Sequence, residues 1–443
     1  MELKIFSILA LGVALSSAGR IDLGLKRKVD MGLVAEAIIE LPQIIGQIQS
    51  NKTLQALSGE AKVSALVITL KDLAFTTQSS IVAQAVAQDL EVKQFRAANI
   101  ILVKGLTTSK LAALGKSEHD FIIREQHVAS VDGGMATSYQ NISTPQWGLA
   151  KMRVPEAWEI TRGEGSVIGV IDTGVNLDHV ALGVNSFAGA WLDPFYQTEK
   201  PTDKDGHGSH VTGTILGREN GIGVPPAAKW IACRGLDHHG IGSEASLTEC
   251  AEFMLTAKPR PHIINNSWGG RSNSDWYQQQ ISAWRDAGMV PVFSIGNSGP
   301  GCESAKSPGD NFNVIAVGST KEDDTVSHFS SRGPTANGLV KPDFAAPGSD
   351  IYSCGTGSDD YLFESGTSMA APHMSGAIAL YLSHNKNATF NMVYNAFADT
   401  AVCLPIGEED ESCGLPGGNT SCHNNAIGWG LIDVAAALKL RSG

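Results

Sequence analysis

The feature that most constrains the fold is a series of short, almost continuously apolar runs, in which both faces of an extended strand would be apolar. The run 167–171 (VIGVI) is the clearest, and similar runs follow at 230–232, 262–266, 290–294 and 314–317. Strands that are buried on both faces, as in the centre of a parallel sheet, have such near-continuous apolar sequences. Helical stretches separate the runs. The alternation predicts an α/β domain with a doubly wound parallel sheet and helices on both faces.

Polar residues follow two of these runs closely. Asp172 comes directly after the run 167–171, and Asn297 comes shortly after the run 290–294. Reacting groups in open α/β sheets lie at the carboxyl ends of the strands. Asp172 and Asn297 are therefore candidate site residues.

Two motifs supply further reactive side chains. The octet 366–373 (GTSMAAPH) contains Ser368, and the segment 205–210 (DGHGSH) sets His207 between glycines. With Asp172 they occur in the order Asp, His, Ser, which is one of the chain orders of a serine-nucleophile triad. The small residues after Ser368 predict a helix that begins near the serine. The N–H groups of its first turn would favour a developing oxyanion.

Each of these residues also has an ordinary structural interpretation. Ser368 could cap a helix, and Asp172 could be a turn residue at a strand end. His210 is a rival to the histidine base, and Asp178 is a rival to the carboxylate that would orient it. The Asp-Thr-Gly sequence that begins at Asp172 also occurs in aspartic peptidases, but those enzymes need a second such motif, which this sequence lacks.

Taken together, the motif blocks and the segments between them resemble the subtilisin family of serine peptidases over residues 145–438. The texture is particularly similar to the bacillopeptidase F branch, because of the segment 228–232 and four aromatic residues, Trp268, Trp276, Tyr277 and Trp284. The resemblance implies a subtilisin-like catalytic domain and serine endopeptidase activity through an acyl-enzyme.

The family pattern also implies roles for the four reactive residues. Ser368 would attack the scissile carbonyl, His207 would carry the proton, and Asp172 would orient the imidazole. Asn297 would donate its side-chain amide to the oxyanion, and loss of such a donor costs on the order of 10²–10³ in turnover. His210 would be structural.

Substrate binding is implied for two glycine-containing segments. In the family, Ser267, Trp268 and Gly269 line the primary specificity pocket and pair with the substrate backbone as an added strand, and Gly296 lies in the second segment. The sequence around Trp268 and Ile295 is neutral, which predicts a broad or apolar substrate preference.

No cofactor and no metal ligand are expected. The longer calcium-binding loop of bacterial subtilisins is absent from the segment 215–225, and a weak calcium site elsewhere stays open as an alternative. The expected partners are protein or peptide substrates and the chain's own propeptide, which would act as an intramolecular inhibitor of a monomer. The net charge of −12 argues against nucleic acid, and no internal apolar run suggests a membrane partner.

The N-terminal third predicts segments that are removed from the mature protein. Residues 1–18 have the pattern of a signal peptide. We expect a propeptide at 19–135, self-cleaved in the small, polar linker 131–138, and a peptidase domain at 136–443.

Within the propeptide, an inhibitor-like α+β module is expected at about 63–125. Residues 19–60 are weakly patterned and indicate helix. The sequence then predicts strands and helices that alternate: strands at 65–70, 100–103 and 121–124, and helices at 79–95 and 110–114.

The seven cysteines predict disulfides in a secreted, extracellular protein, with at least one cysteine left without an internal partner. The pairing stays open, although a bridge among Cys403, Cys413 and Cys422 would staple a loop. Two other functions also stay open. One is a catalytically silent relative that binds peptides or proteins through the same cleft, and the other is a processing enzyme with a narrow choice of substrate.

Overall fold

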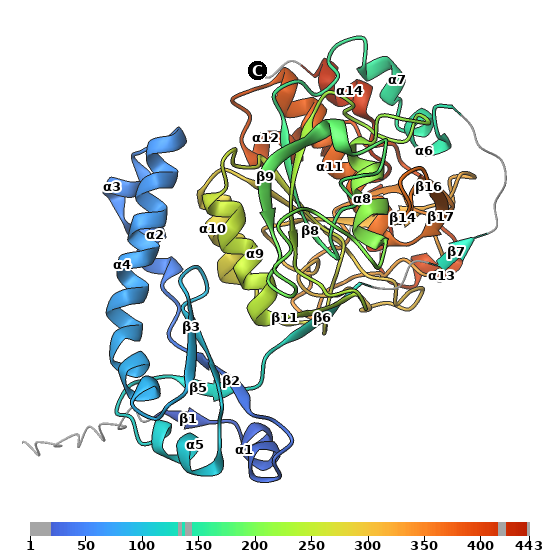
Figure 1. The fold of residues 1–443 in the computed structure, drawn as a ribbon. Coiled ribbons are helices and arrows are strands. Elements are labelled where there is room, and N and C mark those ends of the chain that lie inside the picture. Colours follow the sequence, from blue (N-terminus) through green and yellow to red (C-terminus); the bar gives the residue numbers. More distant parts are fainter. Residues whose placement is uncertain (1–18, 132–134, 138–143, 415–421, 441–443) are drawn as a thin grey trace, which may run out of the picture. The chain divides into compact units, whose positions relative to one another are not determined.

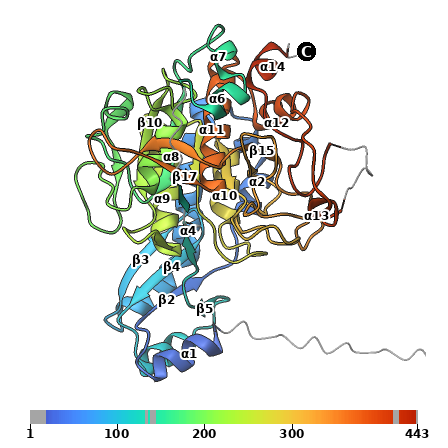
Figure 2. The ribbon, with the colours of Figure 1, turned by 90° about the vertical axis from the view of Figure 1, so that its right-hand side faces the viewer.

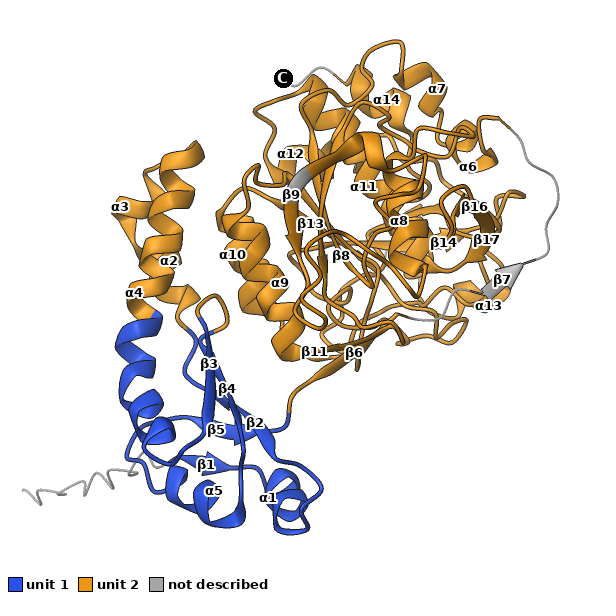
Figure 3. Cartoon of the chain, viewed as in Figure 1, with its two compact units in different colours: residues 1–43, 74–95, 99–125 blue, residues 44–73, 96–98, 126–443 orange. Residues whose placement is uncertain are grey.

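The structure of the 443-residue chain is a computed structural model, which describes residues 19–131, 135–137, 144–414 and 422–440 (Figure 1). The described residues belong to two compact units. Unit 1 comprises 1–43, 74–95 and 99–125, and unit 2 comprises 44–73, 96–98 and 126–443 (Figure 3). The expected signal peptide 1–18 and residues 132–134 and 138 of the expected linker lie outside the described residues.

Unit 1 is a small α+β sandwich. Its five-stranded sheet has the order β1-β5-β2-β4-β3, formed by β1 (Arg20–Ile21), β2 (Glu36–Glu40), β3 (Glu91–Phe95), β4 (Ile100–Lys104) and β5 (Ile122–Arg124). The helices α1 (Leu23–Asp30) and α5 (Thr108–Leu114) and the last turns of α4 (Gly59–Val86) bury Leu25, Leu111 and Ile81 in one cluster with the sheet residues Ile39 and Ile101.

The strands predicted at 100–103 and 121–124 and the helix predicted at 110–114 are confirmed, but the strand predicted at 65–70 is wrong. These residues belong to α4. Val63, Leu66 and Leu70 are buried whereas Ile68 is 60% exposed, which is the three- to four-residue period of a helix.

The helix predicted at 79–95 is wrong in its second half. Helix α4 ends at Val86, Asp89 takes a left-handed turn conformation with φ of 53°, and β3 follows. The segment 19–60 is helical only in part, because β2 pairs with both β4 and β5 there.

Unit 2 contains the predicted doubly wound sheet. Seven parallel strands have the order β15-β14-β13-β12-β8-β10-β9. They are β8 (Val167–Asp172), β9 (Ser186–Leu192), β10 (Lys229–Arg234), β12 (Ile263–Asn266), β13 (Val290–Ser294), β14 (Ile315–Thr320) and β15 (Phe344–Pro347). The five predicted runs are strands, and every residue of β8 is buried. The strand order reverses between β8 and β12, so this sheet has its switch point there.

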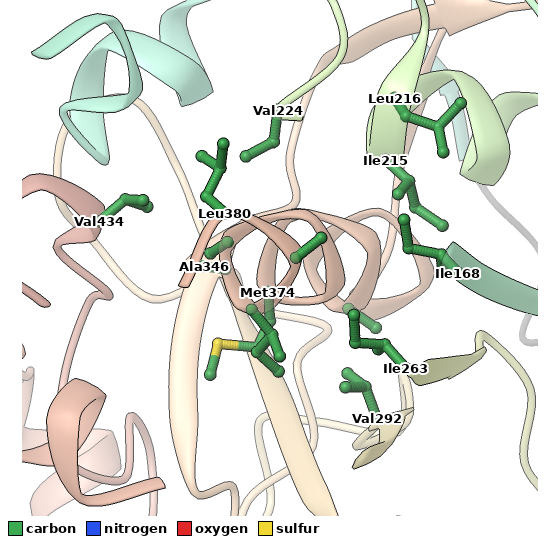
Figure 4. Packing of buried hydrophobic residues seen from close by; sticks show 14 of the residues in the cluster. Ile168, Ile215, Leu216, Val224, Ile263, Val292, Ala346, Met374, Leu380 and Val434 are labelled. Carbon is green, nitrogen blue, oxygen red and sulfur yellow. The ribbon is translucent and has the colours of Figure 1, made fainter. Parts of the chain in front are cut away.

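Helices cover both faces of this sheet. On one face, α8 (His207–Leu216) and α11 (Thr367–His384) lie side by side in two views (Figures 1 and 2). Figure 4 shows Met374 and Leu380 of α11 among side chains of the sheet and of α8, including Ile168, Ile263 and Ile215. On the other face, α9 (Glu244–Thr256) approaches β8 so closely that a Cβ on Gly169 would lie 2.6 Å from Met254 Sδ.

The remaining elements of unit 2 surround this core. The strands are β6 (Val128–Ser130), β7 (Met135–Thr137), β11 (Ile241–Ser243), β16 (Ile351–Cys354) and β17 (Tyr361–Ser365). The helices are α2 (Ile45–Ser50), α3 (Lys52–Gln55), α6 (Trp147–Lys151), α7 (Val154–Ala157), α10 (Gln278–Asp286), α12 (Phe390–Ala398), α13 (Glu408–Glu411), α14 (Val434–Lys439) and the 3₁₀ turn η1 (Gly183–Asn185). None of the helices in the described ranges is long and apolar enough to cross a membrane.

Three disulfides are formed in unit 2: Cys233–Cys250, Cys302–Cys413 and Cys403–Cys422. The last of these staples the C-terminal loop, as the sequence suggested. Cys354 is the cysteine without a partner, and burial raises the pKa of its thiol to about 12.

Candidate active site

Asp172 and His207 form a buried pair at the carboxyl edge of the parallel sheet. Asp172 is the last residue of β8, and His207 is the first residue of α8. The imidazole Nδ1 lies 2.8 Å from Asp172 Oδ1, and Nε2 has no hydrogen-bond partner among the described residues. A carboxylate on Nδ1 fixes the ring so that Nε2 can act as a base.

A second carboxylate holds the start of α8 against the end of β8. Asp203 Oδ1 accepts hydrogen bonds from Thr173 Oγ1 (3.0 Å) and from the Gly206 N–H (3.0 Å), and Oδ2 accepts from the N–H and hydroxyl of Ser209. Thr173 Oγ1 in turn accepts from the Gly208 N–H at 3.0 Å. Asp203 therefore holds Thr173, which follows Asp172 in the chain, and Gly206, which precedes His207. Asp203 was not among the predicted site residues, and its position shortly before a glycine-flanked histidine is the only signal of it in the sequence.

Ser368 lies in the first turn of α11, as predicted. Its hydroxyl donates to the Ser267 carbonyl at 3.2 Å, and the Ser267 hydroxyl donates to the Ser368 carbonyl at 2.9 Å. Ser267 directly follows β12, which pairs with β8 so that Asn266 lies opposite Ile171. The next residues in that register are Ser267 and Asp172. Ser368 is hydrogen-bonded to Ser267, and His207 is hydrogen-bonded to Asp172, so the two reactive groups are held at adjacent strand ends. Adjacent strands lie about 5 Å apart in a sheet.

Asn297 is held beside the first turn of α11. Its side-chain Oδ1 accepts hydrogen bonds from the Thr367 N–H (2.9 Å) and hydroxyl (2.8 Å), and the Gly296 N–H donates to the same hydroxyl. These hydrogen bonds orient the amide of Asn297 so that its oxygen faces Thr367 and its nitrogen faces away from Thr367. The nitrogen can therefore serve as a donor. The structure thus brings the four reactive residues of the sequence analysis to one edge of one sheet.

A model of the subtilase family matches residues 163–430, which span these four residues and the sheet that carries them. The chain belongs to the subtilase family. Its relatives include bacillopeptidase F from Bacillus subtilis (33% identical over 66% of this chain), thermitase from Thermoactinomyces vulgaris (34% over 56%) and subtilisin Savinase from Lederbergia lenta (32% over 66%). The matches cover 22% of bacillopeptidase F, 85% of thermitase and 98% of subtilisin Savinase.

In this subtilase a strand of the same chain already pairs with the segment that carries Gly269. β6 pairs antiparallel with β11, with Ser130 opposite Ile241 and Val128 opposite Ser243. On its other side, Ser130 exchanges two backbone hydrogen bonds with Gly269, of 2.9 and 3.1 Å. An extended peptide that completes a sheet in this way uses main-chain hydrogen bonds that any peptide can make.

The candidate substrate-binding residues contribute in different ways. Gly269 pairs with β6, and Gly296 has a φ of 107°, which favours glycine. The Trp268 side chain is fully buried, and its indole N–H donates to the Ile171 carbonyl at 3.0 Å. It packs edge to face against Tyr277 and Phe293, so only the backbone of Trp268 can contact a substrate.

Burial and neighbouring carboxylates act in opposite directions on the pKa of His207. Burial opposes the charged imidazolium and lowers the pKa of His207, but the Asp172 charge and hydrogen bond, together with Glu364 and Asp205, outweigh burial and raise the pKa to about 9. The rival His210 differs. Its Nε2 lies 3.0 Å from the Ile351 carbonyl, and burial lowers its pKa, as suits a structural residue.

The described residues contain no group of three or more His, Cys, Asp or Glu side chains placed to hold a metal ion.

Proposed function

We propose that this subtilase is a secreted serine endopeptidase that hydrolyses peptide bonds in proteins through an acyl-enzyme. Ser368 attacks the scissile carbonyl while His207 Nε2 takes the hydroxyl proton, and a bond forms between Oγ and the carbonyl carbon. His207 then protonates the leaving amine, and water releases the acyl group by the same steps. Asp172 holds the imidazole throughout.

The oxyanion of each tetrahedral intermediate would accept hydrogen bonds from the Asn297 side-chain amide and the Ser368 N–H. The substrate backbone would pair with Gly269 and β11, beside Ser267, Trp268 and Gly296. The proposed reaction requires no cofactor.

One observation carries the proposal. The buried Asp172–His207 hydrogen bond of 2.8 Å leaves Nε2 without a partner, and Ser368 is attached to the neighbouring strand end through Ser267. A rotation about the Cα–Cβ bond of Ser368 is the change that would redirect its hydroxyl to Nε2. Such side-chain rotations take picoseconds to nanoseconds when unobstructed.

We further propose that the enzyme is made as a self-processing precursor. Residues 1–18 would direct secretion, residues 19–135 would form the inhibitory propeptide, and residues 136–443 the mature peptidase. The pairing of β6 with β11 and Gly269 supports this order, because β6 (Val128–Ser130) belongs to the proposed propeptide and pairs with a proposed substrate-binding residue. The disulfides support an oxidising compartment.

A catalytically silent, peptide-binding subtilase is the second candidate. The observation that favours it is that Ser368 Oγ donates to the Ser267 carbonyl and not to His207. Processing of the purified Ser368→Ala precursor, compared with that of the wild type, distinguishes the peptidase from the silent relative. A self-processing enzyme requires that the alanine variant stay full length while the wild type is cut. If the pure alanine variant is cut as fast as the wild type, self-processing is wrong.

A further inference from the structure

Lys306 lies against both glycine segments of the candidate active site. Its N–H donates to the Ile295 carbonyl at 2.9 Å, so its backbone runs beside the segment that ends in Asn297. A Cβ added to Gly296 would lie 2.5 Å from Lys306 Cγ, and a Cβ added to Gly269 would lie 3.2 Å from Lys306 Cβ. The two glycines therefore leave room for the Lys306 side chain between them.

The register of β6 shows which substrate residue would enter this space. Ser130 lies opposite Gly269, and Val131 continues the strand by donating to the Gly240 carbonyl. In a substrate strand that pairs with Gly269 as Ser130 does, the residue two positions further along would come opposite the residue two positions before Gly269, which is Ser267. Ser267 is hydrogen-bonded to Ser368. A substrate strand in this register presents that residue, and its carbonyl, to the nucleophile.

The Lys306 ammonium has no hydrogen bond or ion pair with any residue in the described part of the chain, and its side chain is half-buried. Asp310 on the same segment has other partners, because its carboxylate accepts from the Ser307 hydroxyl and the Asn273 N–H, both at 2.7 Å. A half-buried cation at the wall of a cleft attracts an anionic side chain, and a carboxylate that it binds forms a charge-assisted hydrogen bond.

We propose that Lys306 makes this site selective for substrates with an acidic residue, Asp or Glu, immediately before the scissile bond. The inference rests on the proposed peptidase function and names the substrate class for it. The chain carries a matching residue of its own. The residue two positions after Ser130 in the sequence is Asp132, which lies outside the described residues. This proposal differs from the broad or apolar preference predicted from the neutral segments around Trp268 and Ile295, because Lys306 belongs to neither segment.

The test compares matched peptides that differ only in the residue before the scissile bond. Purified, processed enzyme is titrated with a fluorophosphonate, and kcat/KM is measured for Glu against Gln and for Asp against Asn, with Leu and Lys peptides alongside. We expect the acids to exceed their amides on the order of ten- to hundredfold, the value of one charge-assisted hydrogen bond.

Variants of Lys306 then assign the preference. Lys306→Met keeps the length of the side chain and should remove the difference between acid and amide, while Lys306→Glu should favour Lys over Glu. The control is Lys386→Met, an exposed lysine outside the proposed site, which should leave every ratio unchanged.

Self-processing gives an independent readout in the full chain. A preference for acidic residues moves the expected cut from Met135 to Asp132, so the wild-type mature N-terminus should be Gly133 and not Ala136. Lys306→Glu should reduce this cleavage, and Asp132→Lys combined with Lys306→Glu should restore it. The inference is overturned if titrated enzyme cleaves acid and amide peptides equally, or if Lys306→Met keeps the preference; the peptidase proposal then stands. If Ser368 takes no label and no peptide is cut, both proposals fail.

Discussion

At the scale of single residues, the candidate site depends on one short hydrogen bond inside the protein. Asp172 and His207 are both buried, so their interaction is weakly screened by solvent. The sequence motifs predicted an interaction between Asp172 and His207, and the two side chains are hydrogen-bonded. They could not reveal Asp203 or Lys306, whose importance depends on contacts across loops.

The pH dependence should follow His207. Only its neutral form can accept the serine proton, so kcat/KM should rise with pH, and the midpoint of the acid limb should lie above the ordinary value of 6.5, toward about 9. The sequence alone could not give this shift, because the balance between burial and the charge of Asp172 is a property of the fold. Measured pH profiles of kcat/KM decide this, and a midpoint below 6.5 would contradict it.

The Asp172 charge should be the cause of that shift. In Asp172→Asn the midpoint should move down, and kcat should fall on the order of 10⁴ because the amide selects the wrong imidazole tautomer. Asp178→Asn is the matched control, since Asp178 is not bonded to His207. An unchanged midpoint in Asp172→Asn would show that another group sets the pKa of His207.

Asn297 should act on turnover more than on binding. Asn297→Ala removes the proposed oxyanion donor, and kcat should fall on the order of 10²–10³ with a small change in KM. The variant also loses the contacts to Thr367, so circular dichroism and thermal unfolding must accompany the kinetics. A rise in KM with unchanged kcat would assign Asn297 to ground-state binding.

At the scale of elements, the site depends on how closely α8 approaches the end of β8. The apolar runs predicted the strands of the main sheet because burial on both faces leaves a signal in the sequence itself. The same signal was misleading at 65–70. These residues belong to the long helix α4, which is buried along one face only and has no proline or glycine in its interior. The strands β9 and β15 were missed, since β9 (SFAGAWL) interrupts its apolar residues with serine and glycine and β15 (FAAP) is only four residues long.

Gly208 tests the packing of α8 on β8. A Cβ at this position would lie 2.1 Å from the Gly174 carbonyl oxygen and 3.1 Å from Asp172 Cβ. Gly208→Ala should therefore lower the free energy of unfolding by about 1–3 kcal/mol. It should also lower kcat/KM on the order of 10², because the histidine is displaced. Gly301→Ala is the control, since nothing lies within 4 Å of that added Cβ; equal stability of both variants would contradict the packing.

At the scale of the whole molecule, disulfides join segments that are distant in sequence. The Cys302–Cys413 bridge closes a separation of 111 residues, and it ties the loop that follows Asn297 to the C-terminal region. Cys403–Cys422 closes only 19 residues. Cysteine count and spacing predicted bridges and one unpaired cysteine, but the pairing depends on which loops the sheet brings together.

Loss of the longer bridge should destabilise the molecule more than loss of the shorter one. In the double variant Cys302→Ala/Cys413→Ala the free energy of unfolding should fall by about 2–5 kcal/mol, because removal of the bridge increases the conformational entropy of a large loop in the unfolded chain. Cys403→Ala/Cys422→Ala should lose less. Urea unfolding of both variants measures the difference, and the reverse ranking would show that native packing around the short bridge outweighs chain entropy.

The central claim is that the ends of β8 and β12 and the first turns of α8 and α11 assemble a working serine nucleophile. The most direct measurement treats the purified, processed protein with a fluorophosphonate and locates the adduct by mass spectrometry. We expect one adduct, on Ser368, absent from Ser368→Ala and strongly reduced in His207→Ala. Folded, processed wild-type protein that takes no adduct on Ser368 would contradict the claim, and the peptide-binding alternative would replace it.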